Sequence, residues 1–298
     1  MAANLTNSEL ENYIADEVRL YAKTRVPVKA SMLERMLVRS ISCVKLHPNP
    51  EDEFCDPHIG PNHQIISSYV KTIKECRKHG DIPWDDDPIE VEKTFPDGYL
   101  ILNGHHRWAA CRIFGYNKTR VHIVNLTQQQ DIEKMLRRSD NHKRATLDFD
   151  EVVLCPESSD HFEKKLRLPG GLFYKEKLKL GIPALFRFLA ENGYDVWVYS
   201  YKYYSFDYIR HLFRKYHSGV TGVVTGAGRK TAAYKEKREQ AEKLFAGKYS
   251  ETLHISVDSV VRIRSGQTDP EMHTINDTEA GWYREVMDTV KDLSDNAE

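Results

Sequence analysis

The stretch TLDFDEVVL, residues 146–154, decides the fold class of the C-terminal half of the chain. Its first five residues alternate between polar and apolar side chains, as in a short strand, and two of them are Asp148 and Asp150. Further strand-like and helix-like stretches alternate beyond it: PALFRFLAENG, YDVWVYS, the helix of Ile209, Leu212, Phe213 and Tyr216, VTGVVTG, and LHISVD. This alternation predicts an α/β domain with a doubly wound, mostly parallel sheet.

Polar side chains stand at the ends of three expected strands. Asp148 and Asp150 close the first, Ser200 closes YDVWVYS, and Asp258 closes LHISVD. Ligands of open α/β sheets bind at the carboxyl ends of the strands. Two adjacent carboxylates resist joint ionisation unless a cation lies between them, and Mg²⁺ suits both oxygen ligands and phosphate. We therefore expect a phosphoryl-transfer site in which one carboxylate attacks phosphorus and the other moves a proton.

TLDFDEVVL, the PALFRFLAENGYDVWVYS block and LHISVDSV resemble the haloacid dehalogenase superfamily, particularly its branch similar to the carboxy-terminal-domain phosphatases, over about residues 146–264. The resemblance implies an aspartyl-phosphate mechanism with Asp148 as nucleophile and Asp150 as general acid and base. Ser200 would hold the phosphoryl group, and Asp258 would complete a Mg²⁺ site with the two aspartates. A lysine before the last motif is also implied: Lys243 fits the spacing best, with Lys230 and Lys248 as alternatives.

Two positions depart from this pattern. Glu151 and Val152 follow Asp150 where a threonine is common in the family, and Ser259 follows Asp258 where many members have a second acid. The insertion between Asp148 and Ser200 is short, so the resemblance implies a minimal cap and an open pocket. Such a pocket would admit a bulky phosphorylated substrate, such as a polymer end or a phosphoprotein.

The N-terminal half contains ILNGHHRWAACRIFG, residues 101–115, in which an apolar strand turns directly into a helix that Gly115 closes. Helix N-termini with free backbone amides attract phosphate or carboxylate, and a guanidinium can bind two oxygens at once. We therefore expect a phosphate-binding turn, formed by Asn103, Gly104, His105, His106 and Arg107.

Together with KLHPNPEDEF and the expected hairpin PIEVEKT–YLILNG, this turn resembles the ParB and sulfiredoxin-like domain over about residues 39–126. Members hold nucleotide phosphates at the turn and include nucleotide hydrolases, a thiol-repair enzyme and free-serine kinases; GHHR is most similar to the kinases. The resemblance implies binding of ATP or another nucleoside triphosphate. Glu53, or alternatively Glu51, would be the base that activates an acceptor hydroxyl. His105 replaces the cysteine of sulfiredoxins, and Asn103 replaces an acid that the kinase pattern favours.

The expected organisation has four parts. Residues 1–38 form a helical segment that opens with Thr6 and Glu9 in capping-box spacing, 39–126 the ParB-like α+β domain, 127–143 a linker helix, and 144–298 the phosphatase-like domain. Two polar clusters are interpreted as ordinary surface: the loop with Cys55, His58 and His63, and the turn at residues 84–87.

Amino-acid composition says more about the cellular compartment of the protein than about its binding partner. The 43 lysines and arginines balance 44 acids, so net charge does not predict nucleic-acid binding, although a local basic groove remains compatible with it. The five cysteines form no CxxC pair, which is typical of reduced thiols in the cytoplasm. The sequence shows neither a signal peptide nor an apolar run of ~18 residues, so we expect a cytoplasmic protein without a membrane partner.

These patterns lead to one main functional hypothesis and two alternatives. The main one is a bifunctional phosphoryl-transfer enzyme, a Mg²⁺-dependent phosphatase joined to a nucleotide-binding domain with possible kinase activity, acting on nucleic-acid ends or nucleotides. The first alternative is a DNA- or nucleotide-binding module that recruits a single phosphatase domain. The second is a ParB-like nuclease.

Overall fold

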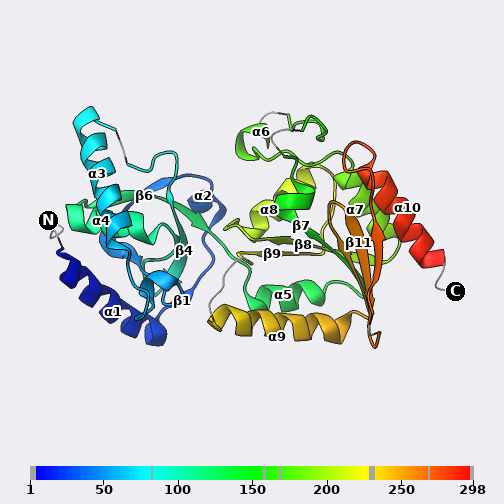
Figure 1. Cartoon of the computed structure of the whole chain (residues 1–298), viewed down its shortest axis with the longest axis horizontal. Coiled ribbons are helices and arrows are strands. Elements are labelled where there is room, and N and C mark those ends of the chain that lie inside the picture. The colour runs from blue at the N-terminus through cyan, green and yellow to red at the C-terminus, as the bar shows by residue number, and fades with distance from the viewer. Residues whose placement is uncertain are drawn as a thin grey trace. The chain divides into compact units, whose positions relative to one another are not determined.

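The computed structural model describes residues 5–81, 83–156, 159–167, 170–227, 232–267 and 269–295. The chain forms two compact units (Figure 1). Unit 1 comprises residues 1–125 with 230–234, and unit 2 comprises residues 126–229 with 235–298. Both contain a sheet with parallel strands, so the fold is α/β as expected. Within the described residues, no helix is long and apolar enough to cross a membrane.

Unit 1 has three main helices on a shared core. They are α1 (Asn7–Thr24), α3 (His63–His79) and α4 (His105–Phe114). The expected capping box of α1 is present, because Thr6 and Glu9 exchange hydrogen bonds of 2.8 and 3.3 Å. Leu10 of α1 is buried in the same core as Trp108 of α4. The N-terminal helical segment is therefore part of this unit's packing.

The sheet of unit 1 has the strand order β2 (Arg39–Ser42), β6 (Lys118–Val124), β4 (Ile89–Phe95), β5 (Tyr99–Asn103) and β3 (Leu46–His47), with β1 (Val26–Pro27) beside β4. The expected hairpin is the antiparallel pair β4–β5. A 3-10 turn at Cys43–Lys45 separates β2 from β3. The Trp108 indole donates to the Cys43 carbonyl at 3.0 Å, which anchors this turn to α4. The short helix α2 (Met32–Arg35) precedes β2.

The sheet of unit 2 has the order β12 (Glu271–Thr274), β11 (Ser259–Arg264), β10 (Glu251–Ile255), β7 (Lys143–Asp148), β8 (Tyr194–Ser200) and β9 (Gly222–Thr225). The strands from β10 to β9 are parallel, whereas β11 and β12 add an antiparallel edge. β7 lies between β8 and β10, so Asp148 ends a central strand of the sheet.

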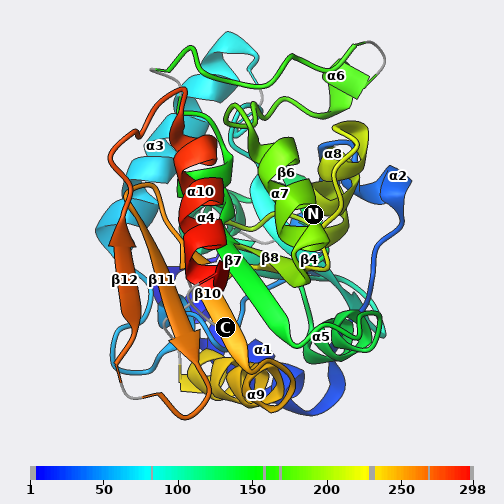
Figure 2. The ribbon, with the colours of Figure 1, turned by 90° about the vertical axis from the view of Figure 1, so that its right-hand side faces the viewer.

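Helices cover both faces of this sheet (Figure 2). One face carries α7 (Ile182–Glu191), α8 (Phe206–Lys215) and α10 (Trp282–Asp295), and the other carries α5 (Gln129–Leu136) and α9 (Ala232–Lys248). The segment expected to be a linker contributes α5, whose Ile132 and Met135 pack with Trp197 and Phe245. Between residue 154 and the start of α7, the described residues form the short helix α6 (Gly170–Phe173) and two isolated bridges, Leu154 with Leu178 and Phe162 with Lys179.

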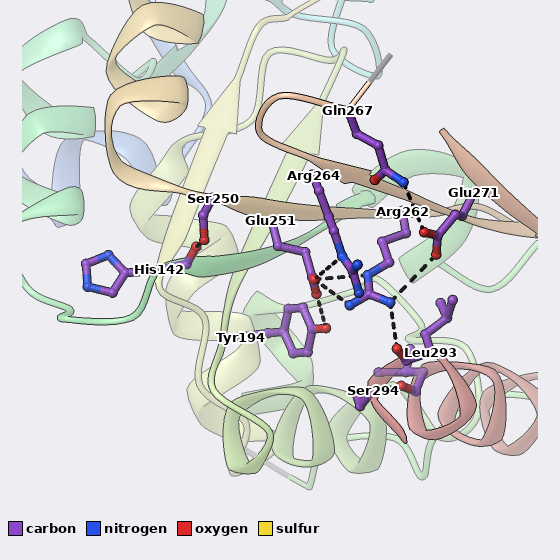
Figure 3. A network of polar contacts seen from close by, with 11 residues as sticks. His142, Tyr194, Ser250, Glu251, Arg262, Arg264, Gln267, Glu271, Leu293 and Ser294 are labelled. Atoms are coloured by element: carbon purple, nitrogen blue, oxygen red, sulfur yellow. Dashed lines mark hydrogen bonds and ion pairs between the residues drawn. The ribbon is translucent and has the colours of Figure 1, made fainter. Parts of the chain in front are cut away.

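A buried ion pair joins β10 and β11 and extends to α10 (Figure 3). Arg262 donates to Glu251 through two nitrogens at 2.9 and 2.7 Å and to the Leu293 carbonyl at 2.6 Å. The Tyr194 hydroxyl on β8 donates to the other Glu251 oxygen. Both charged side chains are at most 7% exposed, so this network fixes the last helix to the antiparallel edge.

Candidate functional site

Asp148 and Asp150 lie next to each other at the carboxyl end of β7. Asp148 is the last residue of the strand, and its Oδ1 accepts the Glu151 N–H at 2.8 Å. The chain then enters a π-helical turn, Phe149–Val153, which contains Asp150 instead of the strand end expected for it. Burial raises the pKa of Asp148, and the nearby charge of Asp150 raises it further. The charge on Asp150 therefore affects the protonation of Asp148.

Asp150 is fixed by the end of the next strand. Its Oδ2 accepts hydrogen bonds from the Ser200 hydroxyl and from the Tyr201 N–H, both at 2.9 Å. Its Oδ1 is buried and has no hydrogen-bond partner among the described residues. The Lys202 ammonium lies 3.8 Å from that oxygen. The structure thus brings three expected residues together, Asp148, Asp150 and Ser200.

Lys202 was not predicted from the sequence. Its signal was present, since it is a basic residue two positions after Ser200 in YSYK. The backbone also holds it in place: its N–H donates to Ser200 Oγ at 3.2 Å, and its carbonyl accepts the Gly226 N–H at 3.1 Å. Lys202 is therefore the cation that this structure places at the paired aspartates.

Asp258 does not end a strand. β10 stops at Ile255, and Asp258 lies in the exposed turn to β11. Its Oδ1 accepts from the hydroxyls of Ser256 and Ser259 at 2.9 and 3.2 Å, and these bonds lower its pKa. In the portion of the chain that is described, no group of three His, Cys, Asp or Glu side chains is gathered closely enough to hold a metal ion.

The lysine predicted from spacing is not beside the aspartates. Lys243 is exposed on α9, and the preceding residue, Glu242, pairs with Arg144 at 3.6 Å. Arg144 lies four positions before Asp148 on β7, which corresponds to about 13 Å of strand. Lys248 instead donates to the backbone carbonyls of Leu136 and Ser139. Lys230 lies outside the described residues.

The turn at Gly104 in unit 1 presents backbone donors. Gly104 joins β5 to α4 with φ of +96°, in the left-handed region that favours glycine. No described side chain caps the start of α4. The N–H groups of the first helical residues, His105, His106 and Arg107, have no intrahelical acceptor and carry the positive end of the helix dipole. The turn therefore presents three backbone donors, and anion binding there stays a prediction.

The two histidines of this turn are held by backbone groups of the preceding loop. The His105 Nε2 accepts the Asn49 N–H, and the His106 Nε2 accepts the Asn62 N–H, both at 3.1 Å. Burial lowers the pKa of His105 to about 4 and also lowers that of His106. A neutral ring that accepts at Nε2 carries its proton on Nδ1. The neutral ring of half-buried His106 therefore carries an N–H donor at Nδ1.

Arg107 does not present an open guanidinium. It is 4% exposed and donates to both the backbone carbonyl and the carboxylate of Asp87. The turn at residues 84–87 is therefore more than solvated surface. Asp85 pairs with Arg120 at 2.6 Å, and the Trp84 indole donates to Cys111 at 3.5 Å. These contacts fix the turn to α4 and β6. The carboxylate of Asp87 is paired with Arg107, the arginine that was expected to bind phosphate.

The remaining residues predicted for this turn lie at its edge. Asn103 donates to Glu90 at 3.2 Å, and burial raises the pKa of Glu90. Glu53 is exposed, but its neighbour Phe54 stacks on His105 with ring centroids 5.3 Å apart, which places the backbone of Glu53 near the turn. His63, from the loop interpreted as ordinary surface, pairs with Glu11 at 2.7 Å.

Comparison with known proteins supports the assignment of the first half. Residues 29–139 match the ParB N-terminal domain family. The match begins after α1 and extends through α5. No curated protein matches the chain.

The comparison with solved structures finds several weak matches. A free serine kinase mutant in complex with AMP has 14% identity and a TM-score of 0.22, covering 90% of this chain and 85% of that one. A second mutant, in complex with ADP, has 13% identity, a TM-score of 0.22 and the same coverage. A conserved hypothetical protein from Pyrococcus furiosus has 12% identity and a TM-score of 0.23, covering 90% of this chain and 88% of that one. At these values the likeness does not extend to function.

Proposed function

We propose that unit 2 is a phosphohydrolase of the haloacid dehalogenase type that works through an aspartyl-phosphate. One observation carries this proposal: Asp150 is held by the Ser200 hydroxyl and the Tyr201 N–H beside Asp148, at the carboxyl end of a central parallel strand. This is where an open α/β sheet binds ligands. The arrangement combines a nucleophilic carboxylate, a second carboxylate for proton transfer and a hydroxyl for the phosphoryl oxygens.

The reaction follows from these positions. An Asp148 oxygen attacks phosphorus, and the bond from phosphorus to the leaving oxygen breaks. Asp150, in its protonated form, gives its proton to that oxygen. Asp150 then takes a proton from a water molecule that hydrolyses the acyl phosphate, which regenerates the Asp148 carboxylate and releases phosphate. The Ser200 hydroxyl and the Tyr201 N–H orient Asp150 for both proton transfers.

The chemistry of the donors suits a magnesium ion. The Asp150 Oδ1 is a buried oxygen without a hydrogen bond in the described structure, and the Asp148 carboxylate is adjacent. These two side chains would hold Mg²⁺. Asp258, which the resemblance implies as the third acid, lies in the turn after the adjacent strand β10 and is not gathered with them into a three-acid group in the described structure. When bound, the ion would offset the negative charge of the phosphoryl group.

Replacing the nucleophile tests this activity. We expect Asp148→Asn to lower turnover by about a thousandfold or more in a screen of nucleotides, phosphorylated DNA and RNA ends and phosphopeptides with Mg²⁺. Glu151→Gln is the matched control, because this neighbouring acid is exposed and only its backbone N–H contacts Asp148. Equal turnover by the wild type and Asp148→Asn would exclude the aspartyl-phosphate.

For unit 1 we propose binding of the phosphates of ATP or another nucleoside triphosphate at the Gly104 turn. The uncapped amides of residues 105–107 and the His106 Nδ1–H support this proposal. With Glu53 as a base, the same turn would act as a kinase, and the whole chain would be bifunctional. The alternatives are a module that binds nucleotide or DNA and recruits the phosphatase, and a nuclease.

Nucleotide titration tests the turn, and transfer assays separate the alternatives. We expect His106→Ala to weaken ATP binding about tenfold, whereas His58→Ala, in an exposed loop, leaves it unchanged. Transfer of label from γ-labelled ATP or CTP to an acceptor would support the kinase, and its loss in Glu53→Gln would assign the base. Salt-sensitive DNA retention without transfer would support the binding module. Metal-dependent plasmid cleavage would support the nuclease.

A further inference from the structure

Lys202 brings an exposed positive charge to the rim of the aspartate site. Its backbone is fixed, because its N–H donates to Ser200 Oγ at 3.2 Å and its carbonyl accepts the Gly226 N–H at 3.1 Å. Its side chain is 67% exposed, and its ammonium pairs, within the described residues, with Asp150 Oδ1 at 3.8 Å. A lysine ammonium on its flexible stem can change partners without any movement of the backbone. The fold therefore sets the position of Lys202 but leaves the partner of its charge open to exchange.

The oxygen beside this ammonium is also the one that suits a metal ion. Asp150 Oδ1 is buried and accepts no hydrogen bond from the described residues, whereas Oδ2 accepts from both the Ser200 hydroxyl and the Tyr201 N–H. Oδ1 is thus the oxygen of Asp150 that is left for Mg²⁺. An ammonium and a divalent cation at one carboxylate oxygen repel each other, most strongly where burial lowers the dielectric constant. Lys202 would therefore leave Asp150 when Mg²⁺ binds there.

A substrate phosphate offers the displaced ammonium a new partner. A phosphoryl group at Asp148 adds negative charge beside two carboxylates, and a nearby cation offsets that charge during transfer. Two of the lysines expected from spacing lie elsewhere on unit 2: Lys243 is exposed on α9, and Lys248 donates to backbone carbonyls. We propose that Lys202 is a phosphoryl-binding residue of this site, and that its ammonium moves from Asp150 Oδ1 to an oxygen of the substrate phosphate.

This inference rests on the proposed phosphatase, but binding of inorganic phosphate, the expected product, tests it without turnover. In titration calorimetry of the full chain with Mg²⁺ present, we expect Lys202→Met to weaken phosphate binding about tenfold, the effect of losing one charge-assisted hydrogen bond. Lys202→Arg keeps the positive charge and should bind phosphate within about threefold of the wild type. Lys215→Met is the matched control, because this exposed lysine is the last residue of α8, and it should leave phosphate binding unchanged.

Binding of Mg²⁺ alone distinguishes a lysine that exchanges partners from a fixed one. Without phosphate, Lys202→Met should bind Mg²⁺ roughly two- to fivefold more tightly than the wild type, because no ammonium competes for Asp150 Oδ1. Phosphate binding equal to that of the wild type, or Mg²⁺ binding that is not tightened, would overturn the inference and leave Lys202 as a fixed partner of Asp150. Failure of the phosphatase proposal is a different result: equal turnover by the wild type and Asp148→Asn, with phosphate binding still dependent on Lys202.

Discussion

His105 and His106 show how a residue's protonation is decided by its backbone contacts. Each Nε2 accepts an N–H from the preceding loop, so protonation of that nitrogen would break the bond. Burial acts in the same direction by disfavouring the imidazolium form. The turn therefore gains its positive potential from helix amides and not from charged histidines, which leaves its shape independent of pH near neutrality.

The low pKa of His105 predicts a pH-dependent stability. In the unfolded chain a histidine titrates near 6.5, whereas folded His105 titrates at about 4. Between these values the unfolded chain binds more protons, so the free energy of unfolding falls as the pH falls, by up to about 3 kcal/mol. Urea denaturation at pH 7, 5.5 and 4.5 should show this fall, and His105→Gln should reduce it while retaining an acceptor for Asn49. Parallel profiles for the two proteins would contradict the prediction.

The ion pair between Asp87 and Arg107 predicts that the Asp87 carboxylate competes with a bound phosphate for the Arg107 guanidinium. The Asp87 carboxylate pairs with this guanidinium, which lies close to Gly104. We expect Asp87→Asn to strengthen ATP binding about tenfold, because the arginine would keep a neutral partner and could turn toward phosphate. Asp85→Asn is the matched control, since Asp85 pairs with Arg120. Titration calorimetry measures both; weaker binding in Asp87→Asn would show that Asp87 positions Arg107 for the ligand.

At the scale of elements, regular patterns were readable from the sequence. The β4–β5 hairpin follows from two alternating runs across Asp97-Gly98, and α4 has the expected bounds because Gly104 and Gly115 mark its ends. The order of the parallel strands of unit 2 and of the helices between them follows equally from hydrophobic periodicity, whereas the antiparallel edge strands β11 and β12 were not expected. Local residue preferences determine such features, so the sequence suffices to predict them.

Features that depend on distant contacts could not be predicted in this way. Asp150 lies in a π-helical turn, and its carboxylate is fixed by Ser200 and Tyr201, fifty residues later. Spacing favoured Lys243, but α9 runs along the sheet face and carries that residue away from Asp148. The contact between Asp87 and Arg107 joins segments on either side of the β4–β5 hairpin. Periodicity contains no information about these pairings.

The network of Figure 3 predicts that loss of the Arg262–Glu251 ion pair, which joins β11 to β10, lowers the stability of unit 2. Arg262→Met would remove both short hydrogen bonds to Glu251 and leave this buried carboxylate with the 3.4 Å contact to Arg264 and the Tyr194 hydroxyl, so we expect it to lower the free energy of unfolding of unit 2 by up to about 3 kcal/mol. Adding Glu251→Gln removes that charge and should restore part of the loss. Urea denaturation of both variants measures the difference. A double variant less stable than Arg262→Met would show that the ion pair is not the origin of the effect.

At the scale of the molecule, the chain has separate cores for its two candidate activities. Trp108 and Ile101 belong to the core of unit 1, whereas Leu147 and Phe213 belong to that of unit 2. Each site is built on the rigid end of a strand within its own unit, Gly104 after β5 and Asp148 at the end of β7. The two sites can therefore be perturbed one at a time.

Glycine-to-alanine substitutions in the full chain test whether the two units can be perturbed one at a time. Gly104→Ala forces a side chain onto a φ of +96° and places Cβ 3.0 Å from the Arg107 guanidinium. Gly222→Ala places Cβ against the buried Trp197 ring, where there is no room for it. We expect each to destabilise its own unit by about 1–3 kcal/mol. Calorimetry should then show two transitions, with a different one lowered by each variant.

The control for both variants is Gly219→Ala, because no atom lies within 4 Å of its Cβ position and its φ is not positive. It should leave the thermogram unchanged. If Gly104→Ala and Gly222→Ala instead lower the same transition by equal amounts, the two cores unfold as one cooperative body. In that case a ligand bound at the Gly104 turn would also stabilise the aspartate site, since stabilisation by binding is shared throughout a cooperative unit.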